Sequence, residues 1–244
     1  GENAEKSYMP DRTSSDLERY SRGYSTRLDN AVGLLRAGKP ADAIAVLERM
    51  YRERPQDLMV MNNLAVAYRR VNRAREALAI LDAGLEFHPG AFGIYINKAD
   101  CLSSLKLYPQ ALAAAEAAIE IAPQVAQAHF ERGKALLFMG EFAPARASLE
   151  TAIGLDNSRP GFHQFLAQAC LRLEDRTGAR AALEELLRLT PQNYTVPINV
   201  SLGTLCVDLE DWTCAKRALE AARKLMPEHR AVKQLGQYYR QRKP

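Results

Sequence analysis

Apolar and small residues follow the spacing of one helix face over the stretch 92–125. In its first half, Tyr95, Ala99 and Leu102 fall on the same side of a predicted helix. The second half carries a similar face, formed by Ala111, Ala115 and Ala118. Pro123 then ends this second helix, because proline has no amide donor and its ring clashes with the preceding turn. The stretch therefore predicts a pair of helices, and neither can bury its apolar stripe without a neighbour.

The same pattern occurs six times, with a small residue at one position of each helix. In the first helix of each pair this position holds Ala31, Ala65, Ala99, Gly133, Ala167 and Gly203. In the second helix it holds Ala43, Ala77, Ala111, Ala145, Ala179 and Ala215. Each series advances by 34 residues four times and then by 36. Small residues let two antiparallel helices approach closely, and leucine at either position would push them apart.

The helix pairs and the segments around them divide the chain into three parts. The predicted pairs are 24–37 with 41–54, 58–71 with 75–88, 92–105 with 109–122, 126–139 with 143–156, 160–173 with 177–190, and 196–209 with 213–226. Ser15 and Glu18 form a capping-box signature, so the first helix is expected to begin near residue 15. We predict a flexible tether over 1–13, a repeat array over 14–229, and a C-terminal capping helix with a basic tail over 230–244.

The period and the small-residue pattern resemble the tetratricopeptide repeat family. The resemblance covers six copies over roughly residues 24–229. It implies an all-α fold, a right-handed superhelical solenoid of antiparallel helix pairs. Such repeats bind peptides and proteins, and the fold alone does not name the partner.

Composition and motifs argue against several other classes of function. The net charge is +4, and the 33 lysines and arginines are spread along the chain, whereas a nucleic-acid-binding protein should cluster them on one face. We find no phosphate-binding loop, dinucleotide fingerprint, zinc-protease motif or nucleophile elbow. His129 and His163 occupy the same position in adjacent repeats, but zinc would need three or four converging ligands. We therefore predict no catalytic residues, no metal, no cofactor and no nucleic-acid partner.

The resemblance also implies where a partner binds, because in this family the first helices line the concave side. Carried over by position, the peptide-binding residues are Asn62, Asn63, Val66, Ile96, Asn97, Phe130, Lys134 and Phe165. The asparagine amides can pair a donor and an acceptor with a peptide backbone. The apolar members offer side-chain pockets for an extended or helical segment. For Ile96 and Phe165, contact between repeats explains the apolar residue equally well.

One well-known mode of the family does not fit this sequence. Some members capture a C-terminal carboxylate with a clamp of lysine, asparagine and arginine from successive repeats. Here the lysine and asparagine of the clamp would be Leu28 and Val32 in one register. In the next register its basic pair would be Gln127 and Glu131. An Hsp70 or Hsp90 co-chaperone is therefore disfavoured.

The four cysteines fall into two groups. Cys101 and Cys170 lie within first helices two repeats apart and are expected to be small core residues. Cys206 and Cys214 flank the turn between the helices of the sixth repeat, and that turn can bring them within disulfide range. We predict that they are bridged, which would imply an oxidising compartment.

The architecture resembles the pilotin lipoproteins of type IV pili, the Tgl, PilF and PilW group. That resemblance implies a non-enzymatic scaffold on the periplasmic side of the bacterial outer membrane, with a secretin subunit as its partner. Membrane attachment would come only from an N-terminal lipid anchor upstream of this sequence. The alternative is a cytosolic adaptor in a multiprotein complex, with four reduced thiols. A signal peptide with a lipobox cysteine upstream would favour the first, and a plain initiator methionine the second.

Overall fold

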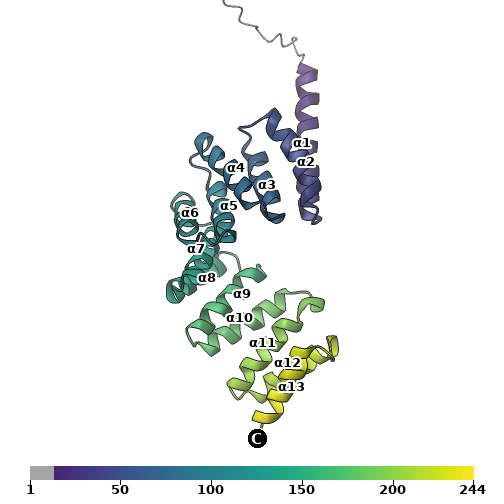
Figure 1. Ribbon diagram of the computed structural model, residues 1–244, viewed down its shortest axis with the longest axis vertical. Coiled ribbons are helices and arrows are strands. Elements are labelled where there is room, and N and C mark those ends of the chain that lie inside the picture. Colours follow the sequence, from purple (N-terminus) through teal and green to yellow (C-terminus); the bar gives the residue numbers. More distant parts are fainter. Residues whose placement is uncertain (1–13) are drawn as a thin grey trace, which may run out of the picture. The chain divides into compact units, whose positions relative to one another are not determined.

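The repeating pattern folds as helices throughout the described part of the chain. The structure is a computed structural model that describes residues 14–244, so the predicted tether lies outside the described residues. Within residues 14–244 there are thirteen α-helices, one short 3-10 helix and no strand. The helices are α1 Ser14–Arg36, α2 Pro40–Glu53, α3 Leu58–Arg70, α4 Ala74–Phe87, α5 Phe92–Ser104, α6 Tyr108–Ile121, α7 Ala126–Met139, α8 Phe142–Leu155, α9 Pro160–Arg172, α10 Arg176–Leu189, η1 Gln192–Tyr194, α11 Val196–Asp208, α12 Trp212–Leu225 and α13 Arg230–Arg242 (Figure 1). The predicted all-α fold of helix pairs is confirmed.

The helix ends agree closely with the sequence pattern. Each second helix begins one residue earlier than predicted, as at Pro40 and Tyr108. The first helix begins at Ser14, which agrees with the start predicted near residue 15. The two extra residues of the last repeat step lie where the chain forms η1.

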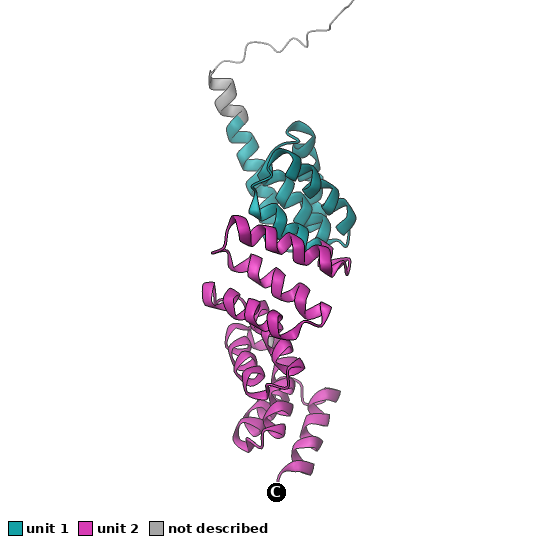
Figure 2. Cartoon of the chain, turned by 90° about the vertical axis from the view of Figure 1, so that its left-hand side faces the viewer, with its two compact units in different colours: residues 1–101 teal, residues 102–244 magenta. Residues whose placement is uncertain are grey.

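The chain divides into two compact units, residues 1–101 and residues 102–244 (Figure 2). In the first unit the small residues of both helices are fully buried: Ala31, Ala43, Ala65 and Ala77 each have 0% exposure. Two tyrosines join helices at the edge of this core. The Tyr24 hydroxyl donates to Asp57, 2.9 Å away, and the Tyr68 hydroxyl donates to Glu48, 2.7 Å away. Burial and the carboxylate of Glu48 raise the pKa of Tyr68 to about 12.

The second unit shows why the repeat requires small residues. A Cβ atom added to Gly133 would lie 2.7 Å from Leu149 Cγ and 3.1 Å from the carbonyl oxygen of Ala145. A Cβ atom on Gly203 would lie 2.6 Å from Leu235 Cδ2. Because real side chains do not approach so closely, α7 can pack on α8 at this distance only without a side chain at Gly133, whereas at Gly203 the end of the Leu235 side chain would have to shift.

Helix α13 covers apolar residues of the last repeat. Its Val232 and Leu235 are buried in one cluster with Val196, Leu219 and Ala222 of α11 and α12. Without this helix the last repeat would expose these residues to water, as a terminal repeat does when it has no cap.

The turn between the two helices of a repeat has the same backbone conformation in all six copies. One residue in each turn has a positive φ, at Gly38, Asn72, Lys106, Gly140, Glu174 and Glu210, with φ between 57° and 87°. This left-handed conformation suits glycine, and occasionally asparagine, because other side chains crowd the following carbonyl. Three of the six turns nevertheless hold Lys or Glu, so the turn conformation is imposed by the helices on either side.

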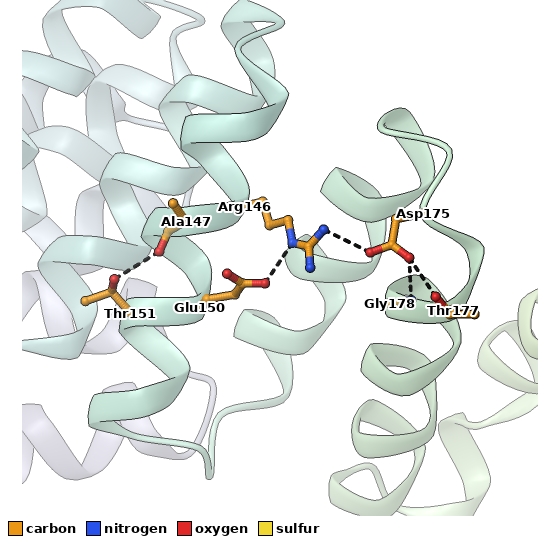
Figure 3. A network of polar contacts seen from close by, with 7 residues as sticks. All are labelled: Arg146, Ala147, Glu150, Thr151, Asp175, Thr177 and Gly178. Carbon is orange, nitrogen blue, oxygen red and sulfur yellow. Dashed lines mark hydrogen bonds and ion pairs between the residues drawn. The ribbon is translucent and has the colours of Figure 1, made fainter.

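An ion-pair network links the second helices of successive repeats in the second unit. Arg146 on α8 donates to Glu150 on its own helix at 2.7 Å and to Asp175 at 2.9 Å (Figure 3). Asp175 in turn accepts from the Gly178 amide and the Thr177 hydroxyl, so it caps the first turn of α10. The next repeat has the same arrangement, made by Arg180, Glu184 and Asp211.

Candidate functional site

The candidate binding residues of the first unit lie on α3 and α5. The amide nitrogen of Asn97 donates to Asn62 Oδ1 at 2.9 Å, so these two predicted residues are brought together. Asn63 donates to the carbonyl oxygen of Met59, one turn earlier on its own helix, at 2.8 Å. Among the described residues, the Nδ2 group of Asn62 and Oδ1 of Asn97 have no further hydrogen bond. The pair therefore presents one donor and one acceptor side by side, the set that an extended peptide backbone requires.

Apolar side chains accompany these amides. Val66 follows Asn62 by one helical turn and shares its face of α3. Val66 and Ile96 are both half-buried, as are the three asparagines. Side chains in this state still expose surface that a partner can cover. Nearby, Arg69 of α3 forms an ion pair with Asp100 of α5 at 2.6 Å.

The candidate residues of the second unit belong to a chain of five aromatic rings. Phe130 stacks on Phe162 with centroids 4.8 Å apart and meets Phe165 edge-on at 5.3 Å. Phe165 meets Phe138 edge-on at 6.1 Å, and Phe138 stacks on Tyr108 at 5.1 Å. The chain runs from Phe162, which is 2% exposed, to Phe138, which is 50% exposed. Phe165 therefore contacts both Phe130, which is buried, and Phe138, which is exposed.

Beside these rings lies a buried ion pair. The Lys134 ammonium is 2.5 Å from a carboxylate oxygen of Glu131 and 5.5 Å from the centre of the Phe130 ring. Gln127 donates to the other Glu131 oxygen at 2.9 Å. The Lys134 side chain is only 10% exposed, and its ammonium group contacts Glu131 and has little access to solvent. A buried pair of this kind holds neighbouring side chains in place, because removing one partner would leave the other charge uncompensated.

A shallow hollow opens beside the buried end of the ring chain. Its volume is about 530 Å³, and its walls include Phe130, Phe162, Gln127 and Arg159. Aromatic walls with amide and guanidinium groups at the rim suit an apolar side chain next to a peptide carbonyl or carboxylate.

Comparison with known proteins decides the family. Three family models, each described as a tetratricopeptide repeat, match residues 34–95, 92–125 and 130–194. The chain belongs to the tetratricopeptide repeat family. The match over 92–125 coincides with the helix pair from which the sequence pattern was first defined. No curated protein matches this sequence.

Several solved structures of tetratricopeptide repeat proteins have the same fold. PilF of Pseudomonas aeruginosa is 17% identical, with a TM-score of 0.73 over 89% of this chain and 98% of its own. PilW, described as a widely conserved type IV pilus biogenesis factor, is 15% identical, with a TM-score of 0.73 over 87% of this chain and 97% of its own. The thermophilic protein TTC0263 of Thermus thermophilus is 23% identical, with a TM-score of 0.66 over 75% of this chain and 99% of its own.

The sixth tetratricopeptide repeat contains the predicted cysteine pair. The sulfur atoms of Cys206 and Cys214 lie 2.05 Å apart and their Cα atoms 5.8 Å apart, which is disulfide geometry. Cys214 points inward and is only 3% exposed. Cys101 and Cys170 are buried and, within the described residues, belong to no disulfide, as expected for core residues. Whether the pair is oxidised in the native compartment stays a prediction.

The two equivalent histidines make equivalent contacts within their tetratricopeptide repeats. His129 Nε2 lies 2.8 Å from the carbonyl oxygen of Pro123, and His163 Nε2 lies 3.2 Å from that of Asn157. Each ring thus binds the backbone at the end of the preceding second helix. In the part of the chain that the structure describes, no three His, Cys, Asp or Glu side chains gather at metal-binding distance. Within the same residues, no helix has the length and apolar character of a membrane span.

Two features of these tetratricopeptide repeats were missed by sequence reasoning. The ion-pair network has a signal in the sequence, because 146–150 reads RASLE and 180–184 reads RAALE. The aromatic chain has a weaker one, because its five members come from three helices and no two of them share a repeat position.

Proposed function

We propose that this chain is the folded part of an outer-membrane lipoprotein that helps a type IV pilus secretin assemble. The observation that carries the proposal is the end-to-end match with two pilus proteins. PilF and PilW are covered over 98% and 97% of their own length, so the similarity extends along nearly the whole of both arrays. An array of that length offers a similar extent of first-helix surface to a partner.

A second observation supports an envelope location. Cys206 and Cys214 lie at disulfide distance, and such bridges persist in oxidising compartments such as the bacterial periplasm. A cytosolic adaptor would keep all four thiols reduced.

We further propose that the partner binds to the first helices. In the first unit the paired amides of Asn62 and Asn97 would hydrogen-bond a partner's backbone. In the second unit the exposed edge of the ring chain, at Phe138 and Phe165, would take up apolar side chains. Aromatic anchors beside amide groups are typical of the centre of a peptide interface.

The test is a deletion of the gene in its native bacterium. Secretin should then remain monomeric or be depleted from the outer membrane, and pili should be lost. Re-expression of the full-length gene should restore both. A variant with Asn62→Ala and Asn97→Ala should restore neither fully, whereas a matched variant on second helices, Lys216→Ala with Arg188→Ala, should restore both. Normal secretin multimers and normal pili in the deletion strain would contradict the proposal.

A further inference from the structure

The chain passes from α12 to α13 through a short connection (Figure 1), and the helix ends beside it carry exposed basic and apolar side chains. Arg223 and Lys224 lie in the last turn of α12, and Arg230 begins α13. All three side chains are exposed. Within residues 14–244 none of the three forms an ion pair, whereas Arg132, Arg146, Arg159, Arg180 and Arg188 of the same unit each pair with a carboxylate. Three positive charges without an ion-pair partner therefore lie at the consecutive ends of α12 and α13, and the Arg223 guanidinium among them lies against Gly236.

Apolar side chains are exposed at the same place. Leu225 is 41% exposed and Met226 is 51% exposed, and they lie between Lys224 and Arg230 in the sequence. Tyr194 of η1 is 68% exposed. The same 3-10 turn meets this connection, because Gln192, Lys224 and Leu225 line one hollow of about 400 Å³. We call these six residues (Tyr194, Arg223, Lys224, Leu225, Met226 and Arg230) the basic tip.

The basic tip differs from the equivalent ends of earlier second helices. Ile121 and Leu155 occupy the repeat position of Leu225 and are also exposed. Each of them, however, is preceded by a residue without positive charge, Glu120 or Gly154, and neither is followed by a large apolar side chain. Among the described second helices, only the last one ends in two exposed large apolar residues flanked by basic residues. Tyr194 belongs to the 3-10 turn formed at the two extra residues of the last repeat step, and that turn shares a hollow with Lys224 and Leu225 through Gln192 and Thr195.

From this combination we infer that the basic tip binds the surface of an anionic phospholipid bilayer. Lysine and arginine would pair with lipid phosphates, and each such charge strengthens attraction to an anionic leaflet. Leucine and methionine would enter the boundary between headgroups and acyl chains, and tyrosine is a preferred residue at that depth. An acidic protein segment would match the three charges but would leave the three exposed apolar side chains without a role. An anionic bilayer offers a contact to all six side chains of the basic tip.

The inference is tested with the purified full chain and vesicles of phosphatidylglycerol and phosphatidylethanolamine in a flotation assay. The protein should float with these vesicles, should not float with phosphatidylcholine vesicles, and should be released as salt screens the charges. The triple variant Arg223→Gln, Lys224→Gln, Arg230→Gln should bind roughly 100-fold more weakly, at about fivefold for each charge. Leu225→Ser with Met226→Ser should weaken binding by at least roughly tenfold.

A matched control separates the basic tip from the protein's overall charge. The variant Lys216→Gln, Arg217→Gln, Arg240→Gln loses the same three charges from exposed positions of α12 and α13 outside the basic tip. It should float like the parent. If both triple variants lost vesicle binding to the same extent, the inference would be overturned. Binding of the parent protein to phosphatidylcholine vesicles as strong as to anionic vesicles would also overturn it. Binding of an oligoglutamate peptide by the basic tip without any flotation would overturn it in favour of an acidic protein partner. Melting curves of every variant establish that each is folded. The flotation results are independent of the secretin assay, so either proposal can fail without the other.

Discussion

Arg146 of α8 donates to the carboxylate of Asp175, 2.9 Å away, and so connects the second helix of one repeat to the cap of the next. Arg180 and Asp211 repeat this contact at 2.8 Å one repeat later. Each aspartate holds the first turn of its helix and receives an arginine from the preceding second helix. The same carboxylate therefore caps one helix and connects it to the preceding second helix.

These caps predict how the protein responds to acid. The Gly178 amide, the Thr177 hydroxyl and Arg146 lower the pKa of Asp175, and the Cys214 amide and Arg180 lower the pKa of Asp211. The Ser158 hydroxyl and amide lower the pKa of Asp156 to about 2. A carboxylate with a lowered pKa stabilises the fold above its unfolded pKa of about 4, and this stability is lost as pH falls through the folded value. Thermal stability should therefore fall between about pH 4 and about pH 2.

The variant Asp175→Asn tests this account. Asparagine still caps a helix but does not titrate and cannot form the ion pair with Arg146. At neutral pH the melting temperature should fall by roughly 2–4 °C. Below pH 4 the curve of melting temperature against pH should be flatter than that of the parent. An unchanged acid profile in both Asp175→Asn and Asp211→Asn would contradict the assignment.

Gly133 predicts a packing defect when any side chain is added. In Gly133→Ala the new Cβ would meet Leu149 at 2.7 Å, so we expect the free energy of unfolding to fall by about 1–3 kcal/mol. Gly154→Ala is the matched control, because nothing lies within 4 Å of its Cβ position on α8. That variant should be more stable by about 0.5–1 kcal/mol, since alanine favours the helix. Denaturant unfolding of both variants measures the difference, and a Gly133→Ala protein as stable as Gly154→Ala would refute the close contact.

The left-handed turns predict that two substitutions will change the free energy of unfolding in opposite directions. Glu174 has φ of 59°, so Glu174→Gly should raise the free energy of unfolding by about 1 kcal/mol. Gly140 has φ of 87°, so Gly140→Ala should lower it by a similar amount. Both are exposed residues of the second unit, so other contacts change little. Two variants that shift stability in the same direction would show that the turn conformation is not the cause.

The sequence was most informative where one residue type had one physical role. Alanine or glycine at the helix contact and proline at the helix end recur with a fixed period, so the fold and nearly every helix end could be predicted. The left-handed turn has a sequence signal at Gly38, Asn72 and Gly140, whereas Lys106, Glu174 and Glu210 carry no such signal. The pairing of Asn97 with Asn62, and of Lys134 with Glu131, depends on side-chain rotamers that a repeat period does not specify.

The cysteine pair predicts the thiol count of the native protein. Protein purified from an oxidising compartment, unfolded without reductant, should contain two reactive thiols, those of Cys101 and Cys170. Unfolding is needed for the count because burial raises the pKa of the Cys170 thiol and slows its reaction. Cys206→Ser with Cys214→Ser should lower the free energy of unfolding by about 2–3 kcal/mol, as the loss of a short disulfide loop does. Four reactive thiols would show that the pair is reduced.

Site-specific crosslinking in the native bacterium tests most directly the claim that the first helices hold a secretin subunit. A photoreactive phenylalanine is placed at Asn63 of α3, at Phe165 of α9, or at Arg188 of α10, whose side chain is 59% exposed on a second helix. The account predicts that secretin is crosslinked from the Asn63 and Phe165 positions and not from the Arg188 position. Crosslinks to secretin from Arg188 alone, or from none of the three positions, would contradict it.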